Sequence, residues 1–366
     1  MTESTDLLIM WAVILARLLV PLTIPRYPLP GVVASSILDM VDYTIIRDRT
    51  NLPMEGYQGF DKALDVYYLT IAYISTLRNW TNLFAFKLIR FLFYWRLVGV
   101  VLFEATQLRP LLFIFTNAFE YVFIFYEVVR LRWDPRKMSK WVMIGATAFI
   151  WIFIKLPQEY ILHIGQFDTT VWVDAFFEAL RTSIWAVVAV VVLVALVIVF
   201  IRWLLGRLPP ADWGLNLAAD PLPAASAGGS EGGQVGAQSE RFFNSALLEK
   251  IIMVSLVSAI FAQILPDVQS TFLQIAIGVA LIIIVNTLLS HWLARRGTTW
   301  SSILRQFIVM SAVNFGLVLV YAILMPGLDG SINLGNTLFF ALLLTLLVTL
   351  YDRYRPMYLE RFANSD

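Results

Sequence analysis

Residues 186–201 read AVVAVVVLVALVIVFI, a run in which every side chain is apolar. Such a run is typical of a helix that spans a lipid bilayer, because a helix satisfies its own backbone hydrogen bonds there. The composition agrees: of 366 residues, 59% are hydrophobic and 14% are charged, whereas a soluble domain carries about 25% charged residues. The sequence therefore predicts an all-α, polytopic membrane protein whose surroundings are the lipid bilayer.

Breaks between the apolar runs divide the chain into roughly ten or eleven hydrophobic helical segments. Pro25, Pro28 and Pro30 separate the first two segments, and LPMEGYQG at 52–59 precedes the third. We expect the segments near 6–24, 31–46, 62–77, 82–106, 110–129, 139–156, 183–204, 246–265, 271–294, 303–325 and 333–351.

Residues 209–240 differ in composition from the rest of the chain. They are rich in Pro, Gly, Ala and Ser, with almost no large apolar side chain after Leu222. Such a segment cannot bury enough surface to fold, so we expect a flexible linker. It divides the chain into an N-terminal membrane module, residues 1–208, with six segments and a long helix, and a four-helix C-terminal module, residues 241–366.

Basic residues in short loops predict the orientation, because such loops stay in the cytoplasm. The loop 130–140 carries several Lys and Arg residues, whereas 157–170 carries acidic residues and neither Lys nor Arg. Continuing this alternation predicts that the linker and the C-terminus are cytoplasmic and that 157–170 is an external turn. Segment 82–106 mixes basic and aromatic residues, so we expect it to lie partly in the membrane interface. The N-terminus and the aspartate-containing loop would then also be cytoplasmic.

Several functional classes are disfavoured by composition. The net charge of +1 gives no reason to expect a nucleic-acid partner. The absence of cysteine excludes thiolate metal sites and iron–sulfur clusters. His163 and His291 are the only histidines and are predicted on opposite sides of the membrane, so we expect no haem. The composition is compatible with a homo-oligomer and with a hetero-oligomer.

Residues 37–65, ILDMVDYTIIRDRTNLPMEGYQGFDKALD, carry the pattern that best suggests chemistry. Asp39 and Asp42 are three residues apart, and Asp61 and Asp65 are four apart, so each pair shares a helix face. Three carboxylates can hold one or two divalent cations, and a fourth can accept a proton. The structural alternative is that these acids cap helices and form ion pairs, for example Asp42 with Arg47.

The order and spacing of these aspartates resemble the signature of the CDP-alcohol phosphotransferases. That signature is D-x-x-D-G-x-x-A-R, eight residues, and then G-x-x-x-D-x-x-x-D, at the end of the second membrane helix and the start of the third. The resemblance covers the first 160 residues at most. The residues that match are Asp39, Asp42, Arg47, Gly56, Asp61 and Asp65.

This sequence departs from the signature at three places. Tyr43 and Ile46 stand where the family has glycine and alanine, and one additional residue separates Gly56 from Asp61. In the family the small residues leave room for the cytidine nucleotide. The larger side chains of Tyr43 and Ile46 would reduce the space for a CDP-linked donor.

The resemblance implies a metal-dependent transferase of phospholipid biosynthesis, which moves a phosphatidyl-type group from a CDP-linked lipid donor to a hydroxyl acceptor. It implies that Asp39, Asp42 and Asp61 bind Mg²⁺ or Mn²⁺ and that Asp65 is the catalytic base. Arg47 and Gly56 would bind the substrate. A second hypothesis is a non-catalytic membrane subunit, scaffold or transporter that uses the same acids as a structural or ion-binding site.

Overall fold

The structure is a computed structural model that describes residues 3–51, 57–165, 169–207, 209–212, 214, 217–219, 245–264, 271–295, 303–324 and 334–362. Within these ranges every regular element is a helix. The N-terminal module contains α1 (Glu3–Leu19), η1 (Val20–Thr23), α2 (Pro28–Arg49), α3 (Tyr57–Asn79), α4 (Leu83–Thr106), α5 (Pro110–Ile114), α6 (Phe119–Arg130), η2 (Pro135–Lys137), α7 (Lys140–Phe149), η3 (Ile150–Lys155), α8 (Leu156–Glu159), η4 (Tyr160–Ile164), α9 (Thr169–Thr182) and α10 (Ile184–Arg207). The C-terminal module contains α12 (Ser245–Ile264), α13 (Phe272–Arg295), α14 (Ile303–Leu324) and α15 (Leu334–Phe362).

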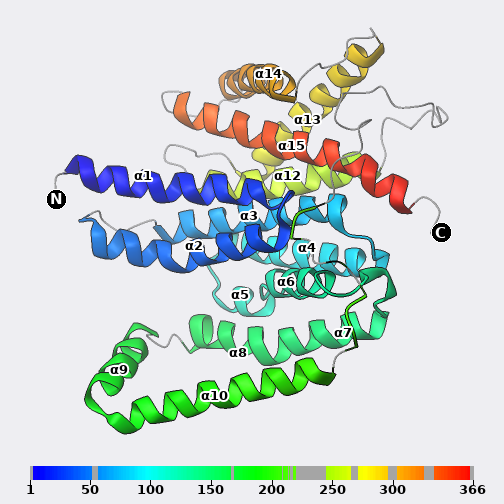
Figure 1. Cartoon of the computed structure of the whole chain (residues 1–366). Coiled ribbons are helices and arrows are strands. Elements are labelled where there is room, and N and C mark those ends of the chain that lie inside the picture. The colour runs from blue at the N-terminus through cyan, green and yellow to red at the C-terminus, as the bar shows by residue number, and fades with distance from the viewer. Residues whose placement is uncertain are drawn as a thin grey trace.

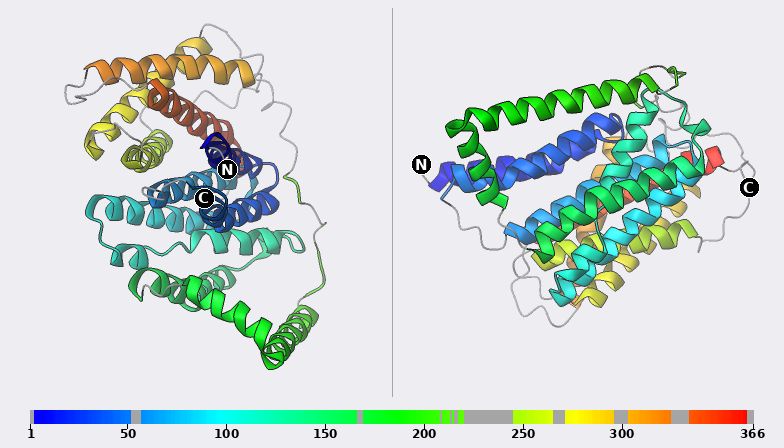
Figure 2. Two further views of the ribbon diagram at one scale, coloured as in Figure 1. Left: turned by 90° about the vertical axis from the view of Figure 1, so that its left-hand side faces the viewer. Right: turned by 90° about the horizontal axis from the view of Figure 1, so that it is seen from below.

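The helices stack side by side, with the two chain ends at opposite ends of the stack (Figures 1 and 2). Six helical segments of the described chain are long and apolar enough to cross a membrane, and a seventh is added if the bent pair α9–α10 counts as one span. This confirms the predicted α-helical membrane protein. Each predicted segment coincides with helix, although the one at 110–129 is interrupted.

Proline and glycine determine the corner between α1 and α2. Pro28 lies in the first turn of α2, where its missing amide hydrogen costs no helical hydrogen bond. A Cβ atom on Gly31 would lie 2.8 Å from the Cα atom of Ile24, so only glycine allows α2 to pass this close to the corner. The chain therefore folds back on itself, and Arg17 near the end of α1 faces the middle of α2.

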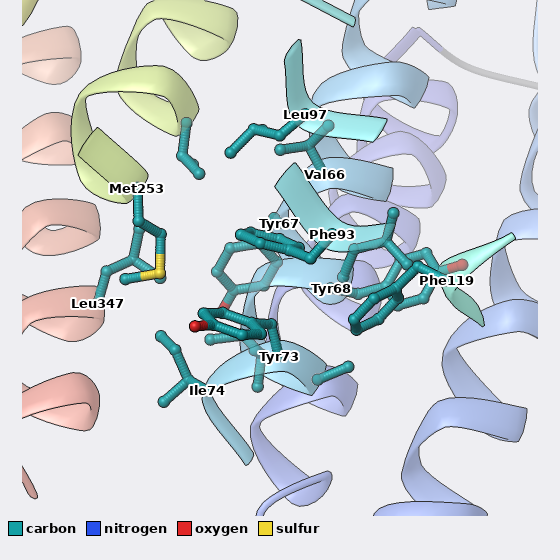
Figure 3. Close-up of a cluster of buried hydrophobic side chains, with 14 of the residues drawn as sticks. Val66, Tyr67, Tyr68, Tyr73, Ile74, Phe93, Leu97, Phe119, Met253 and Leu347 are labelled. Carbon is teal, nitrogen blue, oxygen red and sulfur yellow. The ribbon is translucent and has the colours of Figure 1, made fainter. Parts of the chain in front are cut away.

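The central helix of the stack is α3, which contacts α1, α2, α4, α12 and α15. Almost every side chain from Ala63 to Trp80 is buried. The ring of Tyr73 stacks on Phe93 with their centroids 4.5 Å apart. Figure 3 shows this aromatic cluster together with Met253 and Leu347 of the C-terminal module. Aromatic stacking and apolar burial hold α3 in place although it carries too many polar residues to be a candidate span by itself.

Helix α4 corresponds to segment 82–106, which we expected to lie partly in the membrane interface, and it packs closely on its neighbours. Its buried side chains run from Ala85 to Phe103, almost the whole length of the helix, and it packs on α3, α6 and α12. The Asn82 side chain caps its first turn by accepting a hydrogen bond from the amide of Ala85 at 3.0 Å. Thus α4 is a full member of the stack.

The two ends of the helix stack carry different turns. The start of α7 and the end of α15 lie at one end of the stack, and the start of α1 and the end of α2 lie at the other (Figure 1). The basic turn between α6 and α7 therefore shares an end with the end of α15.

The predicted segment 110–129 is broken in its middle. Helix α5 ends at Ile114, residues 115–118 leave the helical path, and α6 begins at Phe119. The side chain of Phe115 lies directly on Gly99 of α4, where an added Cβ would be 2.0 Å from the Phe115 Cβ. Its ring also packs against Trp95, with centroids 4.6 Å apart. The absence of a side chain at Gly99 therefore makes room for the break.

Gly99→Ala should destabilise the protein by about 1–3 kcal/mol, the usual cost of forcing an additional methyl into a packed site. Gly145→Ala is the matched control, because Gly145 lies within α7 and an added Cβ meets nothing within 4 Å. There the better helix propensity of alanine should give a neutral or slightly stabilising effect of up to about 1 kcal/mol. Thermal unfolding in detergent measures both, and equal melting temperatures would contradict the proposed role of Gly99.

The predicted external turn at 157–170 is wrong in its first part. Helix runs without interruption from Lys140 to Ile164, and α8 is flanked on both sides by the π-helical turns η3 and η4. Pro157 lies in α8 and has no amide hydrogen to donate, and wider turns beside such a residue are a common accommodation. Helix α9 was also not predicted, and Ala175–Thr182 is bent by 110° from Ile184–Leu196.

The C-terminal module docks on α3 and α4 through a buried carboxylate. Glu249 of α12 accepts hydrogen bonds from the hydroxyl groups of Tyr73 and Tyr351, the latter at 3.1 Å. Arg355 and Arg90 place nitrogen atoms 3.6 and 3.9 Å from the same carboxylate. One acid thus connects α3, α4, α12 and α15, so the modules contact each other directly as well as being joined by the linker.

The start of the predicted linker is held against the N-terminal module. The Lys137 ammonium lies 2.6 Å from the Asp212 carboxylate, and the Ala219 amide donates to the carbonyl of Arg26 at 2.6 Å. Hydrogen bonding to Asp212 raises the pKa of Lys137, and the pKa of Asp212 is lowered by the same contact. The remainder of the linker, residues 220–240, lies outside the described residues.

The last helix also completes the end of α3. Arg361 of α15 donates to the carbonyl oxygens of Trp80 at 2.5 Å and of Arg78 at 2.6 Å. Carbonyls at the end of a helix have no partner within that helix, so a basic side chain there supplies the missing donors. Helix α15 therefore continues past the predicted segment 333–351, and its last turns pack on the core.

Candidate functional site

Arg17 is the one basic residue in the otherwise apolar second half of α1, and its side chain is buried. A guanidinium stays charged at any physiological pH, so it requires anionic partners when it is removed from water. Those partners come from α2 and α3, the two helices that pack against α1.

Four aspartates surround this guanidinium. Nη1 of Arg17 donates to Asp42 and, at 2.7 Å, to Asp61. Nη2 donates to Asp39 and, at 2.7 Å, to Asp65. We call these five residues the aspartate centre.

Helical periodicity explains why the four acids meet. Asp39 and Asp42 lie one turn apart on α2, and Asp61 and Asp65 lie one turn apart on α3. The α1–α2 corner and the packing of α3 against both helices turn these two faces toward Arg17. The spacing predicted that each pair shares a helix face, and the packing of the helices brings the two faces together.

The four carboxylates differ in their access to solvent. The Asp42 side chain is 1% exposed and also accepts a hydrogen bond from the amide of Tyr43. The side chains of Asp39, Asp61 and Asp65 are 31%, 38% and 24% exposed. One oxygen from each of these three lies within 4.8 Å of the others, close enough to hold one metal ion. Asp42 also binds Arg17 but lies outside this group of three.

This grouping differs from the roles implied by the family resemblance. There Asp42 is a metal ligand and Asp65 is the base, whereas the structure groups Asp65 with Asp39 and Asp61. Asp65 is therefore positioned either to contact an ion or to accept a proton beside it.

The two predicted substrate-binding residues lie away from this group or outside the described residues. Arg47 contacts Asp48 at 2.8 Å, and its guanidinium lies over the ring of Tyr43 at 5.5 Å, away from the aspartate centre. Gly56 lies outside the residues that the structure describes. Ile46 is buried and Tyr43 is exposed, so only Tyr43 is accessible to a bound molecule.

Sequence reasoning missed the role of Arg17. The signal was present, because a single arginine within a long apolar run has to find a counter-charge. Its partner could not be identified without the fold, since the four aspartates are 22 to 48 residues away in sequence.

With all five groups ionised, the aspartate centre carries four negative charges and one positive charge. Surplus charge of one sign is costly inside an apolar helix stack. The cost falls if a cation binds, or if carboxylates hold protons. The arrangement is thus suited to cation binding, to proton transfer, or to both.

Comparison with known proteins gives no relative from which function can be transferred: no protein-family model, no curated protein and no solved structure matches this chain.

Proposed function

We propose that the aspartate centre binds a divalent cation and that the protein is a membrane-embedded, metal-dependent transferase. The reaction is transfer of a phosphatidyl-type group from a CDP-linked donor to a hydroxyl acceptor, as the resemblance to the CDP-alcohol phosphotransferases implies. The observation that carries the proposal is the convergence of Asp39, Asp42, Asp61 and Asp65, residues that match the acids of the family signature.

The donor set fits Mg²⁺ or Mn²⁺. Both ions prefer hard oxygen ligands, and Asp39, Asp61 and Asp65 supply carboxylate oxygens that lie close together and are accessible. A divalent ion would also offset two of the three surplus negative charges. When bound, such an ion supplies charge stabilisation to phosphate oxygens.

The chain itself supplies the remaining chemistry. Asp65 can accept the proton of an acceptor hydroxyl. Arg17 keeps the carboxylates together through four hydrogen bonds and fixes their orientation. Tyr43 borders the place where the family accommodates the nucleotide, so its exposed ring limits the size of the donor.

The second candidate function is a non-catalytic subunit or transporter that uses the aspartate centre as a structural or ion-binding site. One observation favours it: Arg17 already contacts all four aspartates, as expected of a structural network of ion pairs.

Mg²⁺ or Mn²⁺ should stabilise the purified protein, by about 2.7 kcal/mol at a hundredfold excess over Kd. Asp39→Asn and Asp61→Asn should each abolish this stabilisation, because each removes an anionic ligand. Glu360→Gln is the control, since Glu360 is an exposed acid in α15. Asp65→Asn separates its two roles: a lost metal effect makes it a ligand, and a retained effect with lost turnover makes it the base.

The donor is tested with Tyr43→Gly. If a transferase site has been narrowed, this variant should bind a CDP-linked lipid more tightly than the parent. Metal stabilisation without CDP-lipid binding in either protein would favour the second candidate. No metal-dependent stabilisation of the parent would contradict the proposal altogether.

A further inference from the structure

The interruption between α5 and α6 forms a second polar centre inside the stack. Thr116 and Asn117 lie at this break with 1% and 7% of their surfaces exposed. Non-helical backbone at membrane depth persists only where protein or a polar cavity satisfies it. Part of that need is met by α4, because Arg96 donates to the carbonyl of Phe115 and Trp95 to that of Ile114, both at 3.3 Å.

Charged residues surround the break. The backbone amide of Asn117 donates a hydrogen bond to the carboxylate of Glu159 at 3.4 Å. Lys155, one helical turn before Glu159, is buried over the ring of Tyr121 and interacts electrostatically with Glu120 and Glu159. These residues come from α6 and from the stretch of π-helical turns around α8, which lie next to each other in Figure 1.

Two side chains at the break have buried oxygen atoms without a hydrogen-bond partner among the described residues. These atoms are Oγ1 of Thr116 and Oδ1 of Asn117. Helix capping does not account for them, because the cap residue of α6 is Ala118 and no side chain caps that helix end. A buried polar oxygen left without a partner costs about 1–3 kcal/mol, so two adjacent ones call for a ligand.

The charges and atom types define that ligand. The charged groups that interact electrostatically with Lys155 are Glu120, Glu159, Asp65 and Arg96. When all are ionised, three negative charges stand against the two positive charges of Lys155 and Arg96, which leaves a net charge of −1. The available groups are hard oxygen atoms of hydroxyl, amide and carboxylate type. Interrupted helices inside membrane proteins commonly provide such oxygens to a small cation.

We propose that the break between α5 and α6 is a binding site for a monovalent cation of the Na⁺ class. Its ligands come from Thr116, Asn117 and Glu159, and Lys155 and Arg96 lower the negative charge so that one positive charge completes the balance. The site shares no ligand with the aspartate centre, although Asp65 interacts electrostatically with Lys155, and it does not depend on the function proposed above.

The test is the thermal stability of the purified protein in NaCl against choline chloride at equal ionic strength. Na⁺ should raise Tm in a saturable manner. In the Thr116→Val, Asn117→Leu double variant the apparent Kd for Na⁺ should rise at least about tenfold, equivalent to about 1.4 kcal/mol. Ser258→Ala is the matched control, because it removes a fully buried hydroxyl of α12 that has no hydrogen-bond partner among the described residues, and it should leave the Na⁺ response unchanged.

Asp61→Asn should also retain the Na⁺ response, which separates this site from the aspartate centre. If the double variant does not fold, Thr116→Val alone decides, because valine has nearly the same shape as threonine. The proposal is overturned if Na⁺ has no effect beyond choline in the parent, or if the folded Thr116 variant keeps the affinity of the parent.

Discussion

Arg17→Met is expected to cost at least about 3–5 kcal/mol of folding free energy, enough to prevent accumulation of folded protein when no divalent cation is present. The variant leaves four aspartates, one of them fully buried, without the guanidinium that donates to all of them. Folding yield in detergent and the melting temperature measure the loss. Arg26→Met is the control, because Arg26 has an exposed side chain and the same change there should have an effect within about 0.5 kcal/mol.

The same variant tests whether the aspartate centre binds a cation, which the transferase requires. If the aspartate centre is a cation site, removing a positive charge from it should raise the affinity for Mn²⁺, and millimolar Mn²⁺ should restore folded protein. If the centre is only an ion-pair network, added Mn²⁺ should have no effect. A variant as stable as the parent without metal would show that Arg17 does not hold the aspartates together.

Glu249→Ala should detach the C-terminal module from α3 and α4. The change leaves the hydroxyls of Tyr73 and Tyr351 without their acceptor and Arg355 without its counter-charge. Removing one partner from a buried ionic network costs about 3–5 kcal/mol. A protease site inserted within residues 222–238 allows a direct measurement: after cleavage, the two fragments should co-elute in the parent and separate in the variant.

Arg90→Gln is the control for this experiment. The Arg90 side chain is 42% exposed and lies 3.9 Å from Glu249, so its contribution should be below about 1 kcal/mol and the fragments should stay together. Fragments that still co-elute in Glu249→Ala would show that apolar packing alone, such as that of Met253 and Leu347, holds the modules together.

The sequence predicted those features that depend on local composition and periodicity. Long apolar runs predicted most of the helices, because a membrane helix needs a minimum length of apolar chain, but α15 and the helical stretch from Lys140 to Ile164 continue well past the predicted ends. The spacing of three and four residues placed each aspartate pair on one face. The basic turn between α6 and α7 and the end of α15 lie at one end of the stack, and the cytoplasmic location of that end stays a prediction.

Features that depend on packing between distant segments were missed. The break at 115–118 requires Gly99, which belongs to a different helix. The sequence of 110–129 by itself does not indicate this break. The burial of α4 depends on α12, which lies beyond the linker. The contribution of Arg17 depends on which helix faces α1. In each case the decisive partner is remote in sequence, so that local pattern carries no information about it.

The capping of α3 by Arg361 has a consequence for biosynthesis. Trp80 is synthesised 281 residues before Arg361, and at about 5–20 residues per second the interval is on the order of 15 to 55 seconds. During that time the carbonyls at the end of α3 lack their donors, and the faces of α3 and α4 that will contact α12 and α15 have no partner. The N-terminal module must therefore wait in the bilayer in an open form, shielded by lipid or by the insertion machinery, until the final helix leaves the ribosome and closes the fold.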